Sequence, residues 1–581
     1  MSSLHTKEIN TQIVISLLKA HGIKKVITSP GGTNIAFVGS IQKDPYFEIY
    51  SSVDERSAAY MACGLAEESR EPVVISCTGA TAARNYIPGL TEAYYRKLPI
   101  LALTSTRDIA EVGHHVAQVT DRSSIQNDIV NLSVSLPIVK DSDDLWDCEI
   151  KVNKALLELT RKGGGPVHIN LPTKYVLPFD SKTIPNYRVI KRILKQDKLP
   201  DLAGKVAVFV GSHKKWNPSE VEALDRFCER NNAAVFCDHT SGYNGKYRVL
   251  SSLLAAQEMM DKSVFKPDIL IHIGEISGDY PTLGLSGHQV WRVNEDGEIR
   301  DTFKKLRYVF EMNESDFFNI YNSSGKENKA KECYFTECTQ KLNELRSNIP
   351  ELPFSNAWAA SVLSSKIPAN SVVHLGILSS LRSWNYFEVP EGVRTASNVG
   401  GFGTDGCISS LVGASLNNKD STYYCILGDL AFFYDMNVIG NRHLGKNVRI
   451  LVINNGKGTE FRRYNSASAY FGDDADEFIA AAEHFGNKSR STVKNFSESL
   501  GFEYLSAENK EEFMKVHTRF IGEGLNDKPM ILEIFTDSKD ESESIRLLNT
   551  IGKDGKVSLK SGAKKIIGKT GVNIVKKAIG R

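Results

Sequence analysis

The chain has 581 residues, a formal net charge of +2 at pH 7 and nine cysteines. This length favours about three domains, and the near balance of charge gives no reason to expect bulk nucleic-acid binding. The cysteines form no C-x-x-C pair, which is typical of a reduced cytosolic protein and disfavours zinc or a disulfide framework. Residues 1–10 lack the apolar core of a secretory signal, and no apolar run is long enough to span a bilayer. We therefore expect a cytoplasmic protein.

The first part of the chain, residues 1–184, alternates between predicted helices and strands. Residues 10–20 have helical apolar spacing, and residues 25–28, 73–77 and 99–104 are expected strands. Such alternation predicts a parallel, doubly wound sheet. Tight turns are expected at residues 29–32 and 78–82.

Glu55 follows an expected strand and precedes a helix rich in alanine and glycine. Taken alone, this residue is more simply explained as a helix N-terminal carboxylate that the helix dipole stabilises.

The middle part, residues 185–348, begins with a basic, polar linker and continues with a second, smaller set of α/β elements. Expected strands cover residues 205–211, 233–237, 268–274 and 289–294. The chain has no G-x-G-x-x-G here, and the glycines at 274 and 278 form only a weak pattern. A structural spacer is favoured over a second cofactor site, and FAD is not expected.

Residues 349–545 contain two apolar runs, 423–427 and 448–453, that are expected to be neighbouring buried strands. The first ends at Gly428-Asp429 and the second at Asn454-Asn455. A carboxylate and a carboxamide at strand ends supply the oxygen ligands that Mg²⁺ prefers, at an edge where α/β sheets hold phosphate. The alternative is two ordinary strand exits with turn-forming Asp and Asn.

A glycine loop at residues 400–406 precedes an expected helix at residues 407–415. Such loops can present main-chain amides to anionic groups, which is one interpretation of this loop. The alternative is a packing turn in which Asp405 is the helix N-cap.

The C-terminal segment, residues 546–581, is basic and contains interspersed isoleucine and valine. A basic amphipathic segment can contact an anionic membrane or another polyanion. A solvated tail, or one that orders over the active site, is favoured over membrane contact.

The spacing of Gly428-Asp429 and Asn454-Asn455 resembles the motif of thiamin diphosphate-dependent enzymes. The resemblance implies that Asp429, Asn455 and the carbonyl of Lys457 hold Mg²⁺ on the diphosphate. It implies that Glu55 contacts N1′ of the aminopyrimidine and promotes deprotonation of the thiazolium C2. The other implied cofactor contacts are Gly31, Thr78, Gly401, Phe402, Gly403, Thr404, Gly428 and Leu430.

The order of S-P-G-G, V-D-E-R, T-G-A-T-A-A-R-N and S-N-V-G-G-F-G-T-D-G is similar to that in the SEPHCHC synthase family of the menaquinone pathway. Members of that family add a decarboxylated 2-oxoglutarate unit to isochorismate. The similarity covers most of both outer domains, and acetolactate-synthase-like enzymes are more distantly similar. Substrate contacts implied by the resemblance are Arg107, Gln118, Asn34 and Arg382.

The chain departs from that family at two arginine positions, where it has Thr33-Asn34 and Val399. Arginine is suited to bidentate carboxylate binding, so its loss weakens the grip on dicarboxylic substrates. We therefore expect the same chemistry on a different substrate pair.

The resulting expectation is an α/β protein with three doubly wound parallel-sheet domains: pyrimidine-binding, central and diphosphate-binding. The resemblance implies a homodimer or homotetramer with the site at the subunit interface. The expected reaction is decarboxylation of a 2-oxo acid donor and transfer of the resulting unit to a carbonyl or alkene acceptor. The alternatives are simple decarboxylation to an aldehyde and a non-catalytic binding subunit.

Overall fold

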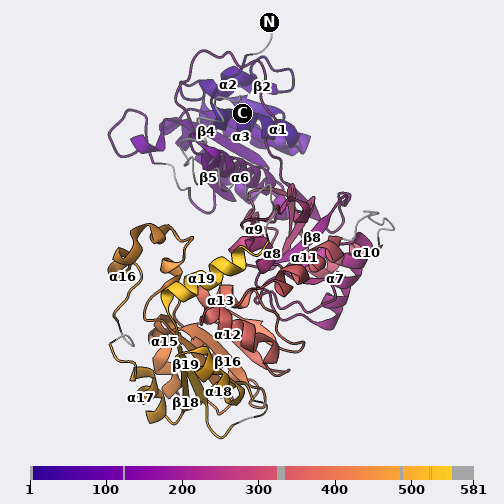
Figure 1. The fold of residues 1–581 in the computed structure, drawn as a ribbon. Coiled ribbons are helices and arrows are strands. Elements are labelled where there is room, and N and C mark those ends of the chain that lie inside the picture. Colours follow the sequence, from indigo (N-terminus) through magenta and orange to yellow (C-terminus); the bar gives the residue numbers. More distant parts are fainter. Residues whose placement is uncertain are drawn as a thin grey trace, which may run out of the picture. The chain divides into compact units, whose positions relative to one another are not determined.

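The computed structural model describes residues 4–121, 125–323, 334–484, 488–522, 524 and 526–552. The chain divides into two compact units (Figure 1). Unit 1 comprises residues 1–194 and 297–309, and unit 2 comprises residues 195–296 and 310–581. The predicted C-terminal tail lies outside the described residues from position 553 onward.

Unit 1 contains a six-stranded sheet with the strand order β2-β1-β3-β4-β6-β5, and its strand pairs are parallel. Strands β3 and β4 are buried along their whole length, as expected for central parallel strands covered on both faces. The strands are β1 (Lys25–Thr28), β2 (Glu48–Ser51), β3 (Val73–Cys77), β4 (Ile100–Thr106), β5 (Leu132–Ser135) and β6 (Val167–Pro172).

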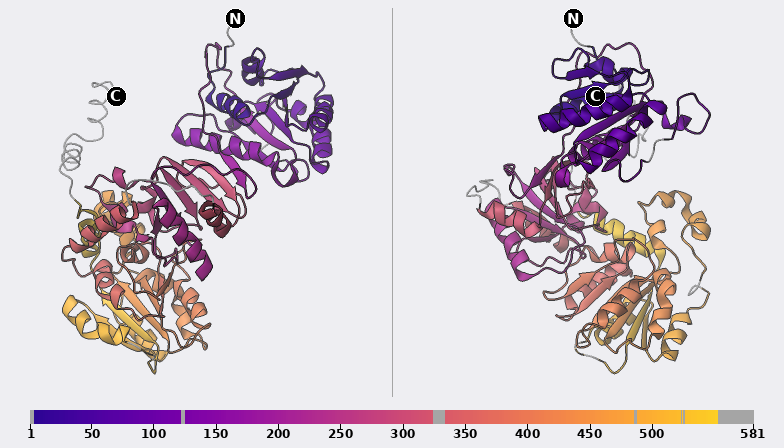
Figure 2. Two further views of the ribbon diagram at one scale, coloured as in Figure 1. Left: turned by 90° about the vertical axis from the view of Figure 1, so that its right-hand side faces the viewer. Right: turned by 180° about the vertical axis from the view of Figure 1, so that it is seen from behind.

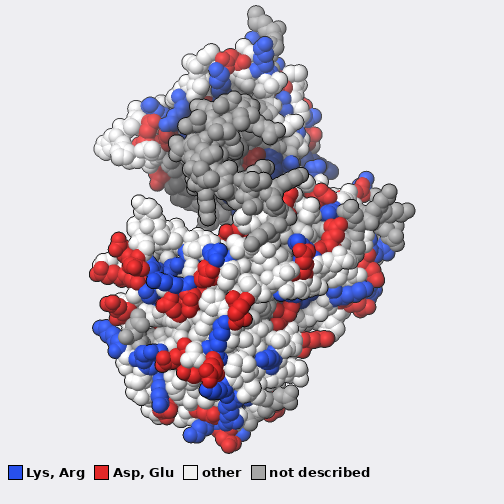
Figure 3. Space-filling model, in the orientation of Figure 1, with Lys and Arg blue, Asp and Glu red and all other residues white. Residues whose placement is uncertain are grey.

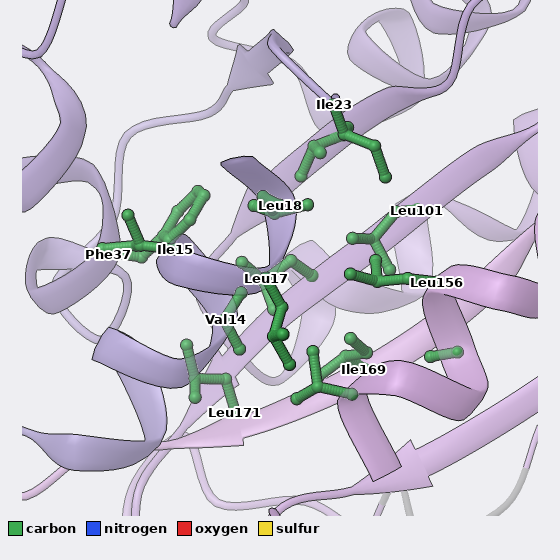
Figure 4. Packing of buried hydrophobic residues seen from close by; sticks show 14 of the residues in the cluster. Val14, Ile15, Leu17, Leu18, Ile23, Phe37, Leu101, Leu156, Ile169 and Leu171 are labelled. Atoms are coloured by element: carbon green, nitrogen blue, oxygen red, sulfur yellow. The ribbon is translucent and has the colours of Figure 1, made fainter. Parts of the chain in front are cut away.

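Helices cover both faces of this sheet (Figure 2). One face packs against α1, α2 and α6, where buried side chains such as Leu17, Phe37 and Leu156 meet β4 and β6 (Figure 4). The other face packs against the alanine-rich α3 and against α5. The helices of unit 1 are α1 (Ile9–Ala20), α2 (Ile35–Ile41), α3 (Glu55–Ser69), α4 (Thr81–Asn85), α5 (Ile87–Tyr95), η1 (Ile109–Glu111), α6 (Ser142–Glu158) and η2 (Arg161–Gly163).

Unit 2 begins with the strands of the middle sheet, which lie in the order β10-β9-β8-β11-β12. These strands are β8 (Val206–Val210), β9 (Ala234–Cys237), β10 (Arg248–Leu250), β11 (Ile269–Ile273) and β12 (Gln289–Asn294). The boundary between the units falls after β7 (Lys191–Leu194) and within β13 (Leu306–Glu311). The helices of this region are α7 (Pro218–Asn231), α8 (Ser252–Ala256), η3 (Ser263–Phe265), α9 (Tyr280–Leu283), α10 (Glu314–Ser323) and α11 (Tyr334–Ser347).

The third sheet also lies in unit 2 and has the order β15-β14-β16-β17-β19-β18, with parallel pairing. Its strands are β14 (Val372–Leu375), β15 (Arg394–Ala396), β16 (Tyr423–Gly428), β17 (Val448–Asn454), β18 (Glu503–Ala507) and β19 (Met530–Phe535). The helices are α12 (Asn356–Leu363), η4 (Ser364–Lys366), α13 (Ser379–Trp384), α14 (Cys407–Ser415), α15 (Asp429–Asp435), η5 (Met436–Gly440), η6 (Thr459–Arg462), η7 (Ala467–Asp474), α16 (Ala475–Phe478), α17 (Thr492–Ser499), α18 (Lys510–Ile521) and α19 (Ser538–Asn549).

Three α/β domains with parallel sheets are therefore confirmed. The strand order reverses between β1 and β3 in the first sheet and between β14 and β16 in the third. Ligands of open α/β sheets bind outside the carboxyl ends of strands at such switch points. The turn at residues 29–32, the turn at 78–80 and Asp429 all follow strands that flank these points.

Candidate active site

The first part of the site is the carboxyl edge of the neighbouring strands β16 and β17. Gly428 of β16 lies in register with Ile453 of β17. Asp429 is the first residue of α15, directly after β16, and Asn455 directly follows β17. Parallel pairing therefore brings the predicted carboxylate and carboxamide to the same edge of the third sheet.

Asp429 is 3% exposed, and the main-chain amides of Leu430, Asn455 and Gly456 lie near its carboxylate. Burial raises the pKa of Asp429 to about 7, although these amides oppose the rise by favouring the ionised form. The Oδ1 atom of Asn455 is also buried, and it has no hydrogen-bond partner among the described residues. Buried polar atoms in folded proteins normally have a partner, so this oxygen is a candidate ligand of a bound group.

The two oxygen-bearing side chains fit a hard divalent cation, which prefers carboxylate and carboxamide oxygens. Within the described ranges, no group of three or more His, Cys, Asp or Glu side chains could hold a metal. A cation at this edge would therefore depend on Asp429, the Asn455 carboxamide and main-chain oxygens.

Lys457 follows in the same loop, and its side chain is held away by an acidic partner. Its Nζ atom lies 2.6 Å from Asp476 Oδ2, and Arg462 Nε lies 3.3 Å from Asp476 Oδ1. Acidic and basic side chains alternate over the face of unit 2 on which α16 and α19 lie (Figure 3). The predicted metal ligand is the Lys457 carbonyl, and this assignment stays a prediction.

The glycine loop lies between β15 and α14. Phe402 has a φ of 56°, and its ring lies 5.9 Å from the ring of Tyr280. A Cβ atom added at Gly401 would meet nothing within 4 Å, so the backbone is open to a ligand on that side. The N-cap of α14 is Gly406, with a φ of 78° and no side-chain cap. The alternative in which Asp405 caps this helix is therefore wrong.

Arg382 lies in α13 and is held by a partner that the sequence analysis did not identify. It forms an ion pair with Glu460 of η6, and its guanidinium lies 5.1 Å from the centre of the Tyr280 ring. Glu460 follows Asn455 by only five positions in the printed sequence. The sequence feature that could have identified Glu460 is its position in the Arg- and Tyr-rich segment after β17.

In unit 1, Gly31 and Thr78 lie together at the switch point of the first sheet. A Cβ atom at position 31 would lie 2.6 Å from Thr78 Cβ, so a larger residue would force the two loops apart. The Thr33 hydroxyl hydrogen-bonds the Thr78 hydroxyl and donates to the carbonyl of Ser105 at 3.0 Å. Side chains thus join the two turns that the sequence predicted to hold the cofactor.

Glu55 begins α3, and the side chain of Asp54 accepts a hydrogen bond from the amide of Arg56 as the N-cap. The Glu55 side chain is partly buried, and Asn85 Nδ2 donates to its Oε2 at 3.4 Å. Asn85 belongs to the T-G-A-T-A-A-R-N stretch but was not singled out as a partner of Glu55. A carboxylate with one weak donor stays available to another group.

The other predicted substrate residues of unit 1 have partners of their own. Arg107 Nε lies 3.0 Å from Glu111 Oε2, and Asn34 is buried with its Nδ2 donating to the carbonyl of Ser29 at 2.9 Å. Gln118 has a φ of 64°. Their roles toward a substrate stay predictions.

The middle sheet has a cavity of about 300 Å³ beyond the carboxyl ends of β8, β11 and β12. Its lining includes acidic Glu275, Glu295 and Glu314 beside His213 and Arg292. His213 Nε2 lies 2.8 Å from Glu314 Oε2, and Arg292 Nη1 donates to the carbonyl of Gly274 at 2.5 Å. These groups are engaged with one another, and the role of the middle domain as a structural spacer stays a prediction.

Residues 10–125 match the family described as "Thiamine pyrophosphate enzyme, N-terminal TPP binding domain". Over nearly its whole length, the chain is also similar to curated proteins named 2-succinyl-5-enolpyruvyl-6-hydroxy-3-cyclohexene-1-carboxylate synthase. The relative from Bacteroides fragilis is 28% identical over 572 residues, which cover 94% of this chain and 99% of the relative. The relative from Phocaeicola vulgatus is 29% identical, with 94% and 98% covered, and that from Desulfotalea psychrophila is 28% identical, with 89% and 96% covered.

The three parallel domains, the edge at Asp429 and Asn455, and these matches define a thiamin diphosphate-dependent enzyme of the transferase or lyase type. Within that class, the resemblance to SEPHCHC synthases that the motifs predicted is confirmed. In the part of the chain that the structure describes, no helix is both long and apolar enough to cross a bilayer.

Proposed function

We propose that the protein uses thiamin diphosphate and Mg²⁺ to decarboxylate a 2-oxo acid and to transfer the remaining unit to a carbonyl or alkene acceptor. The observation that carries this proposal is the position of a buried carboxylate, Asp429, beside the buried carboxamide oxygen of Asn455, which has no hydrogen-bond partner in the described part of the chain. Asp429, Asn455 and the Lys457 carbonyl would hold the cation. When bound, the cofactor would supply the electron sink for decarboxylation.

The residues of this chain would act as follows. Gly401, Phe402, Gly403, Thr404, Gly428 and Leu430 would surround the diphosphate and thiazolium side of the cofactor. Gly31, Thr78 and Glu55 would face the aminopyrimidine, with the Glu55 carboxylate exchanging a proton with N1′. Arg107, Gln118, Asn34 and Arg382 would contact substrate. These assignments are supported by strand-end positions in both outer sheets.

We also propose a homo-oligomer in which the first domain of one copy meets the last domain of another. Unusually exposed apolar side chains support an interface at the start of α3, where Val53 is 81% exposed and Tyr60 and Met61 are about half exposed. Unit 2 has a comparable set around α16, with Tyr470 88% and Phe478 86% exposed. The proposed domains are residues 1–184, 185–348 and 349–545, and the proposed location is the cytoplasm.

Carboligation is proposed ahead of simple decarboxylation because the similarity to synthases spans both outer domains. The presence of Glu55 together with Asp429 and Asn455 disfavours a silent binding subunit, because the proposed proton exchange by Glu55 is needed for turnover and not for binding alone.

The test combines cofactor uptake with product analysis. Purified protein is titrated with thiamin diphosphate and Mg²⁺ by circular dichroism, and CO₂ release is then measured from a panel of 2-oxo acids. Product mass with and without an added carbonyl or alkene acceptor separates carboligation from aldehyde release. Absence of cofactor uptake, or uptake without CO₂ from any 2-oxo acid, would reject the proposal.

A further inference from the structure

A compact charged cluster lies beside the proposed cofactor edge. Glu460 pairs through one oxygen with Arg382 of α13, and Arg463 Nη1 lies 3.3 and 3.2 Å from its two carboxylate oxygens. The hydroxyl of Ser379 donates to Glu460 Oε2 at 3.3 Å. Both carboxylate oxygens are therefore occupied by groups from α13 and from the η6 segment.

The cluster is largely shielded from water. The side chains of Glu460, Arg382 and Arg463 are 19%, 18% and 11% exposed. Two arginines at this depth need a carboxylate partner, because an unpaired charge with restricted access to water is costly. The chain itself supplies that carboxylate.

The cluster also borders the predicted cofactor loop. Arg382 lies over the ring of Tyr280, and the Tyr280 ring in turn contacts the ring of Phe402. The segment that carries Glu460 begins only a few residues after Asn455. Arg382, which is predicted to bind substrate, thus contacts Glu460 directly and is linked to Phe402 of the glycine loop through the ring of Tyr280.

We propose that Glu460 occupies on Arg382 the position that a second, distal substrate carboxylate would take, so that the site selects 2-oxo acids with a single carboxylate. The inference rests on the proposed function. A dicarboxylic donor meets an arginine that already pairs with Glu460 and a like charge beside it, and both effects disfavour it. A donor with an uncharged distal end meets neither obstacle.

The experiment compares 2-oxoglutarate with 2-oxopentanoate, which has the same chain length and a methyl group in place of the distal carboxylate. CO₂ release with thiamin diphosphate and Mg²⁺ gives kcat/KM for each donor. The native enzyme is expected to favour 2-oxopentanoate by at least about tenfold, the range of one charged hydrogen bond. Glu460→Gln is expected to move the ratio at least about tenfold toward 2-oxoglutarate, mainly through a lower KM for that acid.

Asp473→Asn is the matched control. It removes one negative charge from the same part of the chain, where Asp473 pairs with Arg462 and is 91% exposed. The ratio should stay at the native value, because this carboxylate does not contact Arg382 or Arg463 in the described structure.

Glu460→Gln leaves two arginines without their carboxylate partner. A charge-balanced variant, Glu460→Gln/Arg463→Gln, is therefore measured beside it and should show the same shift if the single variant does not fold. Thermal stabilisation by each acid gives the same comparison without turnover. A native preference for 2-oxoglutarate, or an unchanged ratio in both variants, overturns the inference. Failure of every 2-oxo acid to release CO₂ would instead reject the proposed function, while the binding comparison still decides the role of Glu460.

Discussion

The main-chain amide of Asn455 favours the ionised form of the Asp429 carboxylate, although the two residues follow different strands. Because β16 and β17 are parallel neighbours, both residues emerge at one edge, with Oδ1 of Asn455 left without a partner among the described residues. The proposed cation site is therefore built on strand pairing.

Asp429→Ala should lose the cofactor. Removal of a direct oxygen ligand is expected to weaken Mg²⁺-dependent thiamin diphosphate binding by at least about 100-fold, the upper range for outer-sphere partners. Equilibrium titration by circular dichroism gives the affinity. Asp420→Ala, which changes an exposed residue before β16, is the control and should bind normally. Equal affinity in the two variants would show that Asp429 is not a ligand.

Glu55→Gln should keep the cofactor and lose turnover. The amide cannot exchange a proton with the aminopyrimidine, and a positioned acid–base group contributes about 10² to 10⁴-fold to rate. Steady-state CO₂ release and the same titration measure the two effects. Glu67→Gln, on the same helix and paired with Arg96, is the control and should keep native turnover. Native turnover in Glu55→Gln would defeat the proposed role.

Mixing the two inactive variants tests the shared site. If Glu55 of one copy serves the Asp429 edge of another, a mixed dimer of Glu55→Gln and Asp429→Ala has one intact site and one doubly altered site. Unfolding the two proteins together and refolding them should restore up to about a quarter of native activity in a random dimer population. Each variant refolded alone is the control. No recovery despite mixed oligomers, detected by differential tagging, would place both residues of a site in a single copy.

The buried carboxyl group of Glu541 should make the stability of the fold depend on pH. Its carboxylate is buried in α19 and accepts from the Asn356 amide at 2.9 Å and the Thr536 hydroxyl at 2.7 Å. Burial raises its pKa from 4.5 to about 7. Between these values the folded protein keeps a proton that the unfolded chain releases, so this contribution to stability falls as pH rises from about 4.5 to 7.

Glu541→Gln stays neutral, so relative to native protein it should gain about 3 kcal/mol of stability between pH 4.5 and 8, as an order of magnitude. Urea unfolding midpoints at several pH values give the comparison. Glu543→Gln is the control, because pairing with Arg546 lowers the pKa of Glu543 and reverses the sign of its contribution. A constant difference between Glu541→Gln and native protein across this range would contradict the assignment.

Much of the outer domains could be predicted from sequence because their central strands are continuous apolar runs. The expected runs at residues 73–77 and 448–453 correspond to β3 and β17, which extends one residue further. The residues that directly follow β16 and β17 carry the motif, so the positions of Asp429 and Asn455 at the strand ends could also be predicted from the sequence.

Elements and partners that depend on tertiary context could not be predicted from the sequence. Strand β7 lies inside the predicted linker, because its four residues include two basic side chains and show no long apolar run. Glu460 was not singled out because its significance comes from Arg382, which is distant in sequence and meets it only in the folded chain. Local pattern cannot report such a pairing.

The pairing of β16 with β17 also ties metal retention to the integrity of one sheet. Asp429 and Asn455 directly follow a continuous ladder from Tyr423–Val448 to Gly428–Ile453. Release of the ion on heating should therefore coincide with loss of amide-exchange protection in these two strands. The amount of bound metal would then report local unfolding of the last domain.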